Sequence, residues 1–401
     1  MKHRKLLLNV AFLLGCLASC ATIGQTKLAG LVGNGSVILQ SPSGKTLVDI
    51  NSDHVLTPAS IVKLPLAHVA LATLSDKFRF ETHFYVNNDK DLLIRGLGDP
   101  FLVSEEIALI AENLRKAGLT SVRQIVVDDS AFEPELNLPL EMGADDPYAA
   151  RNSALAVNFN TVNLERGADG QLISGEPQTP LTMLAQKFGA GLALGEEKRV
   201  NLGADPIDGL HQVQQLFNFF LIEAGITVAG SDFRREALSA AWEPFYQHHN
   251  SRTLGENLDG LLRYSNNFIA NQLFLTLGAQ LEGYPVTTEV ASKALRASLV
   301  SVYGEGFGSD PTLLLMSEGS GLGRSQKTSA AGMIHILNRF KPYAELLPEY
   351  NGVLRKSGTL TGVYNFVGYI RGTEGLYPFV ILTNQAQNNR DAVLRLLKER
   401  I

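Results

Sequence analysis

Apolar and polar residues follow two different periods along this chain. A period of two, typical of strands, is found in residues 36–53 on both sides of a turn at Ser43 and Gly44, and again after residue 356. A period near 3.6, typical of helices, is found in residues 60–74, 105–117, 210–226 and 388–401. The pattern therefore predicts strands and helices in the same chain.

The composition is that of a globular protein. The chain has 401 residues, of which 45% are hydrophobic, and this is enough for one large core or two smaller ones. The net charge is −5, and the positive residues form no basic patch. We therefore expect no nucleic-acid partner.

The N-terminal residues have the layout of an export signal. Three cations, Lys2, Arg4 and Lys5, precede an apolar run over residues 6–17 that is too short to span a bilayer as a helix. We expect residues 1–19 to be a signal peptide that is removed. Removal leaves at most one cysteine, so no disulfide can form within one mature chain.

Residues 17–20, Leu-Ala-Ser-Cys, resemble the bacterial lipoprotein box, in which the cysteine receives lipid and becomes the new N-terminus. The resemblance implies a membrane anchor on Cys20. Ala21 follows in place of the aspartate that retains lipoproteins in the inner membrane of enteric-type bacteria. We therefore expect an outer-membrane lipoprotein that faces the periplasm. The alternative is an ordinary cleaved signal with a chance cysteine.

One helical segment places a hydroxyl and an amine on the same face. Ser60 and Lys63 are three residues apart in an apolar run, so both side chains are expected on one side of a helix. Thr57 and Pro58 are suited to cap and start this helix, and Pro65 is expected to bend it. A lysine desolvated by apolar neighbours can act as a base toward serine. The alternative is a surface lysine beside a capping serine.

Two further polar groups follow later in the chain. Ser265 and Asn267 stand at the start of an apolar helical run, and residues 356–359 read Lys-Ser-Gly-Thr before a strand-like segment. Each pattern alone could be a helix cap, a helix start or a charge on a strand. In this order, however, S-x-x-K, S-x-N and K-[ST]-G are the signature of the serine penicillin-binding proteins and serine β-lactamases.

Longer stretches of the sequence show which of these protein families the chain resembles. Tyr264-Ser265-Asn266 also fits the Y-x-N pattern of the class C β-lactamases, but its surroundings resemble the D-alanyl-D-alanine carboxypeptidases of the penicillin-binding protein 4 type, the peptidase S13 family. The stretches similar to that family are residues 58–67, 95–102, 125–132, 154–162, 265–274, 318–324 and 357–370. The chain departs from the family pattern at Ser357, where threonine is commoner, and at Glu318, where aspartate is usual. It is also short for the family.

The resemblance implies an α+β fold of the serine β-lactamase and penicillin-binding-protein type. In this fold helices flank an antiparallel five-stranded sheet that both chain ends build. The long interval between Lys63 and Ser265 predicts a large inserted α/β domain. We expect residues 20–80 and 241–401 to form the catalytic domain, and residues 81–240 to form the insert.

The resemblance also implies roles for the motif residues. Ser60 would attack the carbonyl between two D-alanines of a peptidoglycan stem peptide, and Lys63 would take its proton. Ser265 would pass a proton to the leaving D-alanine. Asn267 would orient Lys63 and the substrate amide.

The strand-like motif would bind the other end of the substrate. Lys356 and Ser357 would hold the terminal carboxylate by charge and hydrogen bonding, next to Gly358. By family analogy, the backbone N–H groups of Ser60 and Thr359 would form the oxyanion hole. No metal or other cofactor is required.

The sequence also leads to expectations for an aspartate pair and a histidine pair. In the family, an acidic residue of the inserted domain faces the catalytic cleft and could meet the free amine of the peptide's diamino acid. We assign this role to Asp128 ahead of Asp129, with a strand-end capping role as the alternative. His248 and His249 lie in a polar stretch and are expected to be solvated.

Three functions fit these motifs. A D-Ala-D-Ala carboxypeptidase, with endopeptidase action on cross-links, is favoured, and β-lactam antibiotics would then be covalent inhibitors. A serine β-lactamase would need fast deacylation, and we find no pattern like the deacylating element of class A. A catalytically idle binding lipoprotein is disfavoured because all three motifs are intact.

Overall fold

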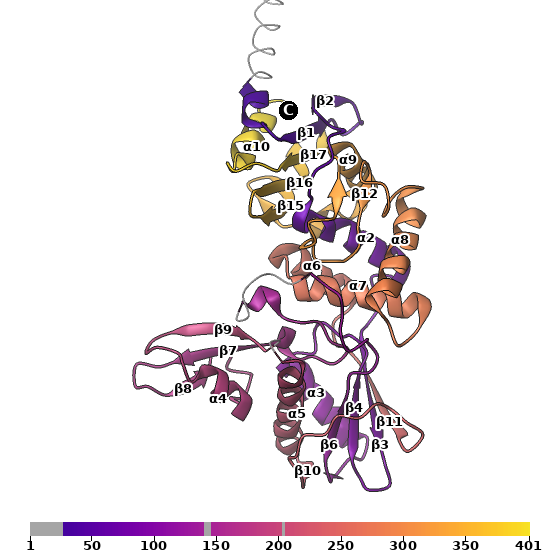
Figure 1. Ribbon diagram of the computed structural model, residues 1–401, viewed down its shortest axis with the longest axis vertical. Helices are drawn as coiled ribbons and strands as arrows, with labels where there is room; N and C mark the ends of the chain where they lie inside the picture. Colours follow the sequence, from indigo (N-terminus) through magenta and orange to yellow (C-terminus); the bar gives the residue numbers. More distant parts are fainter. Residues whose placement is uncertain (1–26, 140–145, 203–204) are drawn as a thin grey trace, which may run out of the picture. The chain divides into compact units, whose positions relative to one another are not determined.

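The computed structural model describes residues 27–139, 146–202 and 205–401. The expected signal peptide, Cys20 and Ala21 lie outside these residues. The described chain forms two compact units (Figure 1). The first unit contains the chain up to Ile61, Glu305–Leu315 and Arg324–Ile401, and the second contains Val62–Gly304 and Met316–Gly323.

The first unit is built around an antiparallel sheet. Its strands are β1 (Gly35–Gln40), β2 (Thr46–Ile50), β14 (Glu349–Tyr350), β15 (Val353–Leu360), β16 (Val363–Gly372) and β17 (Gly375–Thr383). They pair in the order β14-β15-β16-β17-β1-β2, and each pair is antiparallel. The five longer strands match the sheet expected from the sequence, and β14 adds two residues at one edge.

Helices cover both faces of this sheet. The other elements of the unit are η1 (Ala59–Val62), β12 (Leu314–Leu315), β13 (Lys327–Thr328), α9 (Ala330–Phe340), η4 (Lys341–Leu346) and α10 (Arg390–Lys398). On one face, Val393 and Leu397 of α10 join the apolar core beneath the strands. On the other face, α9 lies against β1, β16 and β17, and the buried Tyr369 donates a hydrogen bond to the carbonyl of Leu337. The expected C-terminal helix is thus confirmed.

The second unit contains a mixed four-stranded sheet in the order β11-β3-β4-β6. Its strands are β3 (Glu81–Val86), β4 (Leu92–Gly96), β6 (Ile125–Asp128) and β11 (Glu243–His249). The parallel strands β4 and β6 flank α3 (Ser104–Lys116), the helix that the apolar period over residues 105–117 predicted. Because β11 pairs with β3, this sheet extends past residue 240, where the sequence analysis ended the insert.

Two helices pack on this sheet, α3 and α5 (Pro206–Glu223). Figure 1 shows both helices beside β4 and β6. The side chain of Asp205 accepts a hydrogen bond from the N–H of Ile207, and Pro206 takes the first helical position. The buried apolar side chains of the two helices include Ile107, Ile110, Leu114, Leu210, Val213 and Phe217. The short strands β5 (Ser121–Val122) and β10 (Thr227–Val228) pair in parallel nearby.

A smaller module precedes α5. It consists of β7 (Thr161–Arg166), β8 (Leu172–Ser174) and β9 (Glu197–Asn201), in the order β8-β7-β9, together with α4 (Met183–Gly189). The module has its own apolar core of residues such as Leu164, Leu184 and Leu202. The chain enters it through η3 (Asn158–Asn160), where three successive residues have φ values of 49°, 61° and 56°. Asparagine suits two of these positions because its short polar side chain tolerates left-handed backbone.

The second unit also holds a layer of helices that carries Lys63 and the S-x-N motif. These are α2 (Lys63–Leu74), α6 (Leu254–Tyr264), α7 (Asn267–Glu282) and α8 (Thr288–Tyr303), with the short η2 (Pro147–Ala149) against α7. Helix α2 contacts the other three long helices. Its residues from Lys63 to Leu71 are all buried, which is typical of a helix surrounded by protein. No helix within the described residues is both long enough and apolar enough to cross a membrane.

His248 is buried, which corrects the expectation that it is solvated. Its Nε2 lies 2.6 Å from Oε1 of Glu106, whose carboxylate also accepts hydrogen bonds from the N–H and hydroxyl of Ser251. Burial would raise the pKa of Glu106, but the hydrogen bonds from His248 and Ser251 outweigh it and lower that pKa. His249, in contrast, is exposed.

Candidate active site

Ser60 lies in η1, a 3₁₀ turn that runs directly into α2. The turn begins at Ala59, one residue after the start expected at Pro58. Ala59 is fully buried and has a φ of 51°, a left-handed conformation that costs alanine about 1–2 kcal/mol. Backbone strain of this kind is typical of functional sites.

Pro65 does not interrupt α2, in contrast to the bend expected from the sequence. It is the third residue of the helix, which continues to Leu74. The N–H groups of a first helical turn have no acceptor within the helix, so a proline there removes no helix hydrogen bond.

A buried asparagine fixes the loop before Ser60. The side-chain amide of Asn365, on β16, donates to the carbonyls of Thr57 and Pro58 at 3.0 and 2.8 Å. Its oxygen accepts a hydrogen bond from the N–H of Thr383 at 3.0 Å. The sequence analysis missed Asn365, although a buried amide in the middle of an apolar strand is unusual for strand composition.

Strand β15 packs directly on the turn that carries Ser60. A Cβ placed on Gly358 would lie 2.6 Å from the carbonyl oxygen of Pro58 and 3.2 Å from the backbone nitrogen of Ile61. The first distance is shorter than the contacts of real Cβ atoms, and the second is unusually tight. The glycine of the K-S-G motif is therefore needed for the close approach of β15 to the turn.

The motif on β15 lies at an edge of the sheet. Strand β14 pairs only with Val353 and Leu354, and the N–H of Arg355 still bonds to Pro348. Alternate residues of a strand direct their N–H groups to the same edge. The N–H groups of Ser357 and Thr359 therefore face the same edge as that of Arg355, at a point where β14 no longer pairs with β15. Backbone donors at such an edge can bind a carbonyl or an oxyanion.

Side chains around this motif supply positive charge. Lys356 is almost fully buried, and its Nζ donates to the carbonyl of Ser357 at 2.8 Å. Arg390 donates to the hydroxyl of Thr359 at 2.7 Å and lies over the ring of Phe366. Burial lowers the pKa of Arg390. The field of these cations favours an anionic group at the strand.

Lys63 is fully buried in the second unit and donates hydrogen bonds to two oxygens. One is Oδ1 of Asn267, 2.8 Å from the lysine Nζ, and the other is the backbone carbonyl of Ser320. The predicted link between Lys63 and Asn267 is present. The sequence analysis missed Ser320, because a backbone carbonyl has no residue signature.

Glu318 organises the loop that carries this carbonyl. One of its oxygens accepts from the N–H and hydroxyl of Ser320, and the other from the N–H groups of Gly321 and Gly323. The Oδ1 of Asn271, on α7, accepts from the N–H of Ser320 as well. Glu318, at a position where the family commonly has aspartate, thus holds this loop in place through its hydrogen bonds.

Ser265 lies at the junction of α6 and α7. It ends α6 with φ and ψ of 56° and 34°, in the left-handed region, and Asn266 caps α7 by accepting from the N–H of Ile269. This tight turn separates Ser265 from Asn267, which begins α7. Both residues of the S-x-N motif are therefore positioned by one helix–helix turn.

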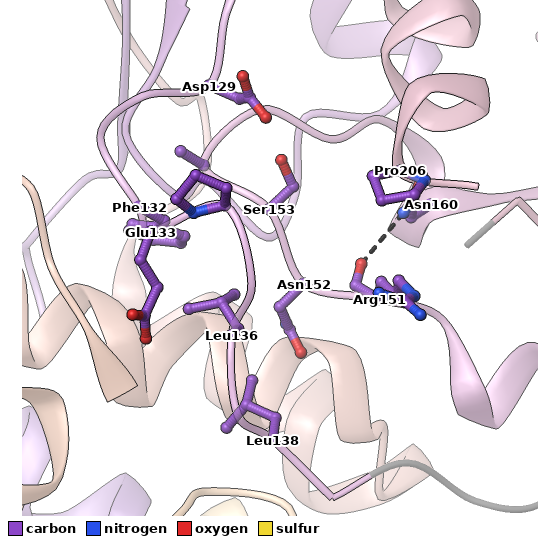
Figure 2. Close-up of a pocket in the computed structure, with 12 residues that line it drawn as sticks. Asp129, Phe132, Glu133, Leu136, Leu138, Arg151, Asn152, Ser153, Asn160 and Pro206 are labelled. Carbon is purple, nitrogen blue, oxygen red and sulfur yellow. Dashed lines mark hydrogen bonds between the residues drawn. The ribbon is translucent and has the colours of Figure 1, made fainter. Parts of the chain in front are cut away.

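Asp128 and Asp129 have different surroundings. Asp128 is buried at the end of β6, where its oxygens accept hydrogen bonds from the N–H groups of Ser130 and Leu238. These contacts favour the strand-end capping alternative. Asp129 pairs with Arg235 and lines a pocket that Phe132, Glu133, Leu136 and Asn152 also line (Figure 2).

The motif residues thus form two sets. In the first unit, Ser60 lies in a turn packed against Gly358 of β15, the strand that also carries Lys356, Ser357 and Thr359. In the second unit, Lys63 is bonded to Asn267, two residues after Ser265. The chain joins the sets through the three-residue step from Ser60 to Lys63.

Replacing Asn365 with aspartate tests how the Ser60 turn is held. The change keeps the shape but removes the Asn365 amide, so the carbonyl of Pro58 loses this donor, while that of Thr57 keeps a hydrogen bond from the amide of Asn384 at 3.2 Å. A buried group left unpaired costs about 1–3 kcal/mol, so we expect the unfolding free energy to fall by about 1–3 kcal/mol and acylation of Ser60 by a penicillin to slow at least about tenfold. Denaturant unfolding and stopped-flow acylation would measure both.

The matched control for that variant is Asn338→Asp, which makes the same change at an exposed position of α9. It should leave stability and acylation near their original values. Equal behaviour of the two variants would show that Asn365 does not hold the turn.

Comparison with known proteins identifies the family. The model of the D-Ala-D-Ala carboxypeptidase 3 (S13) family matches residues 22–199 and 198–350. A D-alanyl-D-alanine carboxypeptidase of Actinomadura sp. (strain R39) is 25% identical over 91% of this chain and 80% of its own length. D-alanyl-D-alanine carboxypeptidase DacB of Haemophilus influenzae is 22% identical over 92% of this chain and 89% of its own length. The chain belongs to the S13 family, as its motifs indicated.

Solved structures confirm the fold. Penicillin binding protein 4 (dacB) from Haemophilus influenzae superposes with a TM-score of 0.75 at 18% identity, over 94% of this chain and 98% of that chain. A predatory endopeptidase from Bdellovibrio bacteriovorus gives a TM-score of 0.51 at 16% identity, over 91% of each chain. At these identities the likeness establishes the penicillin-binding-protein fold.

Proposed function

We propose that this member of the S13 family is a serine-type D-Ala-D-Ala carboxypeptidase that acts on peptidoglycan stem peptides through an acyl-Ser60 intermediate. The observation that carries the proposal is the setting of Lys63. Lys63 is fully buried and donates hydrogen bonds to Oδ1 of Asn267 and to the carbonyl of Ser320, so its amine is desolvated and held in a fixed position. Lys63 can then take the proton of Ser60, three residues earlier.

The reaction has two stages. The Oγ of Ser60 attacks the carbonyl carbon of the penultimate D-alanine as its proton passes to Lys63. The C–N bond then breaks, and Ser265 passes a proton to the leaving amine of the terminal D-alanine. Water hydrolyses the acyl-enzyme ester. The same steps would cleave a D-alanyl cross-link between two stem peptides, so endopeptidase action is part of the proposal.

Strand β15 would bind the substrate during these steps. Lys356 and the Ser357 hydroxyl would hold the terminal carboxylate, and the N–H of Thr359, at the open edge, would bind the oxyanion together with the N–H of Ser60. A donor of this kind is typically worth about 3–4 kcal/mol of transition-state stabilisation. Asp129 is our candidate for the free amine of the diamino acid, in place of the buried Asp128. Asp129 now accepts two hydrogen bonds from Arg235, at 2.7 and 3.1 Å, and an amine bound there would share the carboxylate with this arginine or replace it.

Product analysis on purified muropeptides tests the function. Release of D-alanine from pentapeptide stems marks the carboxypeptidase, and conversion of cross-linked dimers to monomers marks the endopeptidase. Rapid turnover of a penicillin without D-alanine release would instead identify a β-lactamase. Acylation by penicillin with neither reaction would identify the idle binding protein.

We also propose that lipid on Cys20 anchors the protein in the outer membrane, facing the periplasm. The lipoprotein-box resemblance of residues 17–20 supports this proposal. Cys20→Ala should release the protein into the soluble periplasmic fraction or stall its processing, as measured by membrane fractionation and immunoblotting. Ser19→Ala, which keeps the cysteine, should stay with the membrane. Unchanged attachment of Cys20→Ala would contradict the anchor.

A further inference from the structure

A large cavity lies in the second unit. It has a volume of about 620 Å³, is partly open to solvent, and is lined by α5, the residues that lead into α4, the loop after β10 and Ile125 of β6. Figure 1 shows α4 and α5 as neighbours, and their residues are in contact. The volume falls in the ~300–1,000 Å³ range of small-molecule binding sites. No residue of the three catalytic motifs lines it.

Apolar side chains form most of the cavity wall. They are Ile125, Pro180, Leu181, Met183, Phe219, Ile222 and Phe233. Met183, Phe219 and Ile222 remain 74%, 42% and 51% exposed. Large apolar side chains that gather around a cavity and stay exposed mark a binding surface.

One face of α5 adds polar groups to this wall. His211, Gln215 and Asn218 are spaced by four and three residues, so they lie along one side of the helix. The Oε1 of Gln215 accepts a hydrogen bond from the N–H of Leu184, which leaves the amide nitrogen available as a donor. Within the described parts of the chain, no group hydrogen-bonds the side chain of Asn218. The ring of His211 stacks on Phe233 at 3.9 Å, so the two rings form a flat platform.

The charges around the cavity limit the kinds of ligand that it can bind. No lysine or arginine is found among the described residues that line it, and the charged lining residues are Glu223 and Asp232, both exposed. An anionic ligand would meet no cation and two carboxylates. An ammonium group held inside would find no buried carboxylate to replace its lost hydration. A neutral ligand with apolar faces and amide or hydroxyl groups fits best.

We propose that this cavity binds N-acetylated amino sugars of a glycan strand. The C–H face of such a sugar would pack on the aromatic and aliphatic wall, and its acetamido group would pair with the amides of Gln215 and Asn218. The inference rests on the proposed function, because the stem peptides of peptidoglycan are attached to a glycan of these sugars. The cavity would hold the polymer while its peptides are cleaved at Ser60.

Binding of tetra-N-acetylchitotetraose to the purified full-length protein tests the proposal. Isothermal titration should detect binding of this sugar, and at least tenfold weaker binding of cellotetraose, which lacks acetamido groups. Asn218→Leu and Phe219→Ala should each weaken binding of the N-acetylated tetramer at least tenfold. Asn388→Leu, the same change at an exposed position of the first unit, should leave it unchanged.

Several results would overturn the inference. These are no binding of the N-acetylated tetramer, equal binding by Asn218→Leu and the original protein, or binding of a sugar-free stem peptide that Asn218→Leu abolishes. Acylation of Ser60 by penicillin, measured on the same samples, keeps this test separate from the proposed function. Normal acylation without sugar binding would overturn only the glycan site, whereas an original protein without acylation would count against the catalytic assignment.

Discussion

Ser60→Ala is expected to abolish covalent labelling by a fluorescent penicillin. The strained amide of the penicillin mimics the D-alanyl-D-alanine bond, so the nucleophile that attacks the peptide should also open the drug. Slow deacylation should keep the adduct attached to Ser60. Removal of the hydroxyl leaves no atom at this position to form the ester, so labelling should fall to background on a gel. D-alanine release should fall with it.

Mass spectrometry of the labelled original protein should find the adduct on the peptide that contains Ser60 alone. Ser239→Ala, at an exposed position of the second unit, is the control and should label normally. Because Ser60 is partly exposed in a single turn, the alanine variant should unfold at the same denaturant concentration as the original. Persistent labelling of Ser60→Ala, or an adduct mapped to Ser265, would show that the nucleophile is misassigned.

The sequence predicted best the residues whose side chains are proposed to take part in the reaction. The spacing of Ser60 and Lys63 was readable because a helix converts three positions into one face. The bond from Lys63 to Asn267 joins two motifs that the sequence had already paired by order. The strands and helices around them were readable because their apolar periods are long and regular.

The groups that hold these residues in place were harder to predict. The carbonyl of Ser320 receives a hydrogen bond from Lys63, but any residue type could supply it. Asn365 acts through contacts with Thr57 and Pro58, which are distant in sequence and share no pattern with it. Long-range polar pairs of this kind become visible only when the fold brings them together.

The same reason explains the wrong expectations. His248 looked solvated because its neighbours in sequence are polar, yet its partner Glu106 comes from α3. Pro65 was expected to bend α2 because the helix was expected to begin at Pro58. With the α-helix beginning at Lys63, the proline falls in the first turn, where it costs no hydrogen bond.

Lys63→Ala is expected to slow acylation of Ser60 by penicillin by about 10² to 10⁴-fold, the usual loss when a general base is removed. The rate constant should be measured by stopped-flow fluorescence at saturating drug, so that weaker binding is excluded. Lys356→Ala should differ, because it removes the cation proposed to bind the carboxylate. It should raise the drug concentration needed for half-maximal rate more than it lowers the limiting rate.

Removing a buried lysine also destabilises the fold. The experiment must therefore separate this destabilisation from the loss of the base. Lys63→Met keeps most of the side-chain volume and lacks the amine, so it should be as slow as Lys63→Ala while unfolding closer to the original protein. Lys77→Ala, an exposed lysine beyond the end of α2, is the control and should acylate normally. Near-normal acylation in Lys63→Met, with the fold intact, would mean that another group takes the proton of Ser60. The pairing of Lys63 with Asn267 and Ser320 would then be structural.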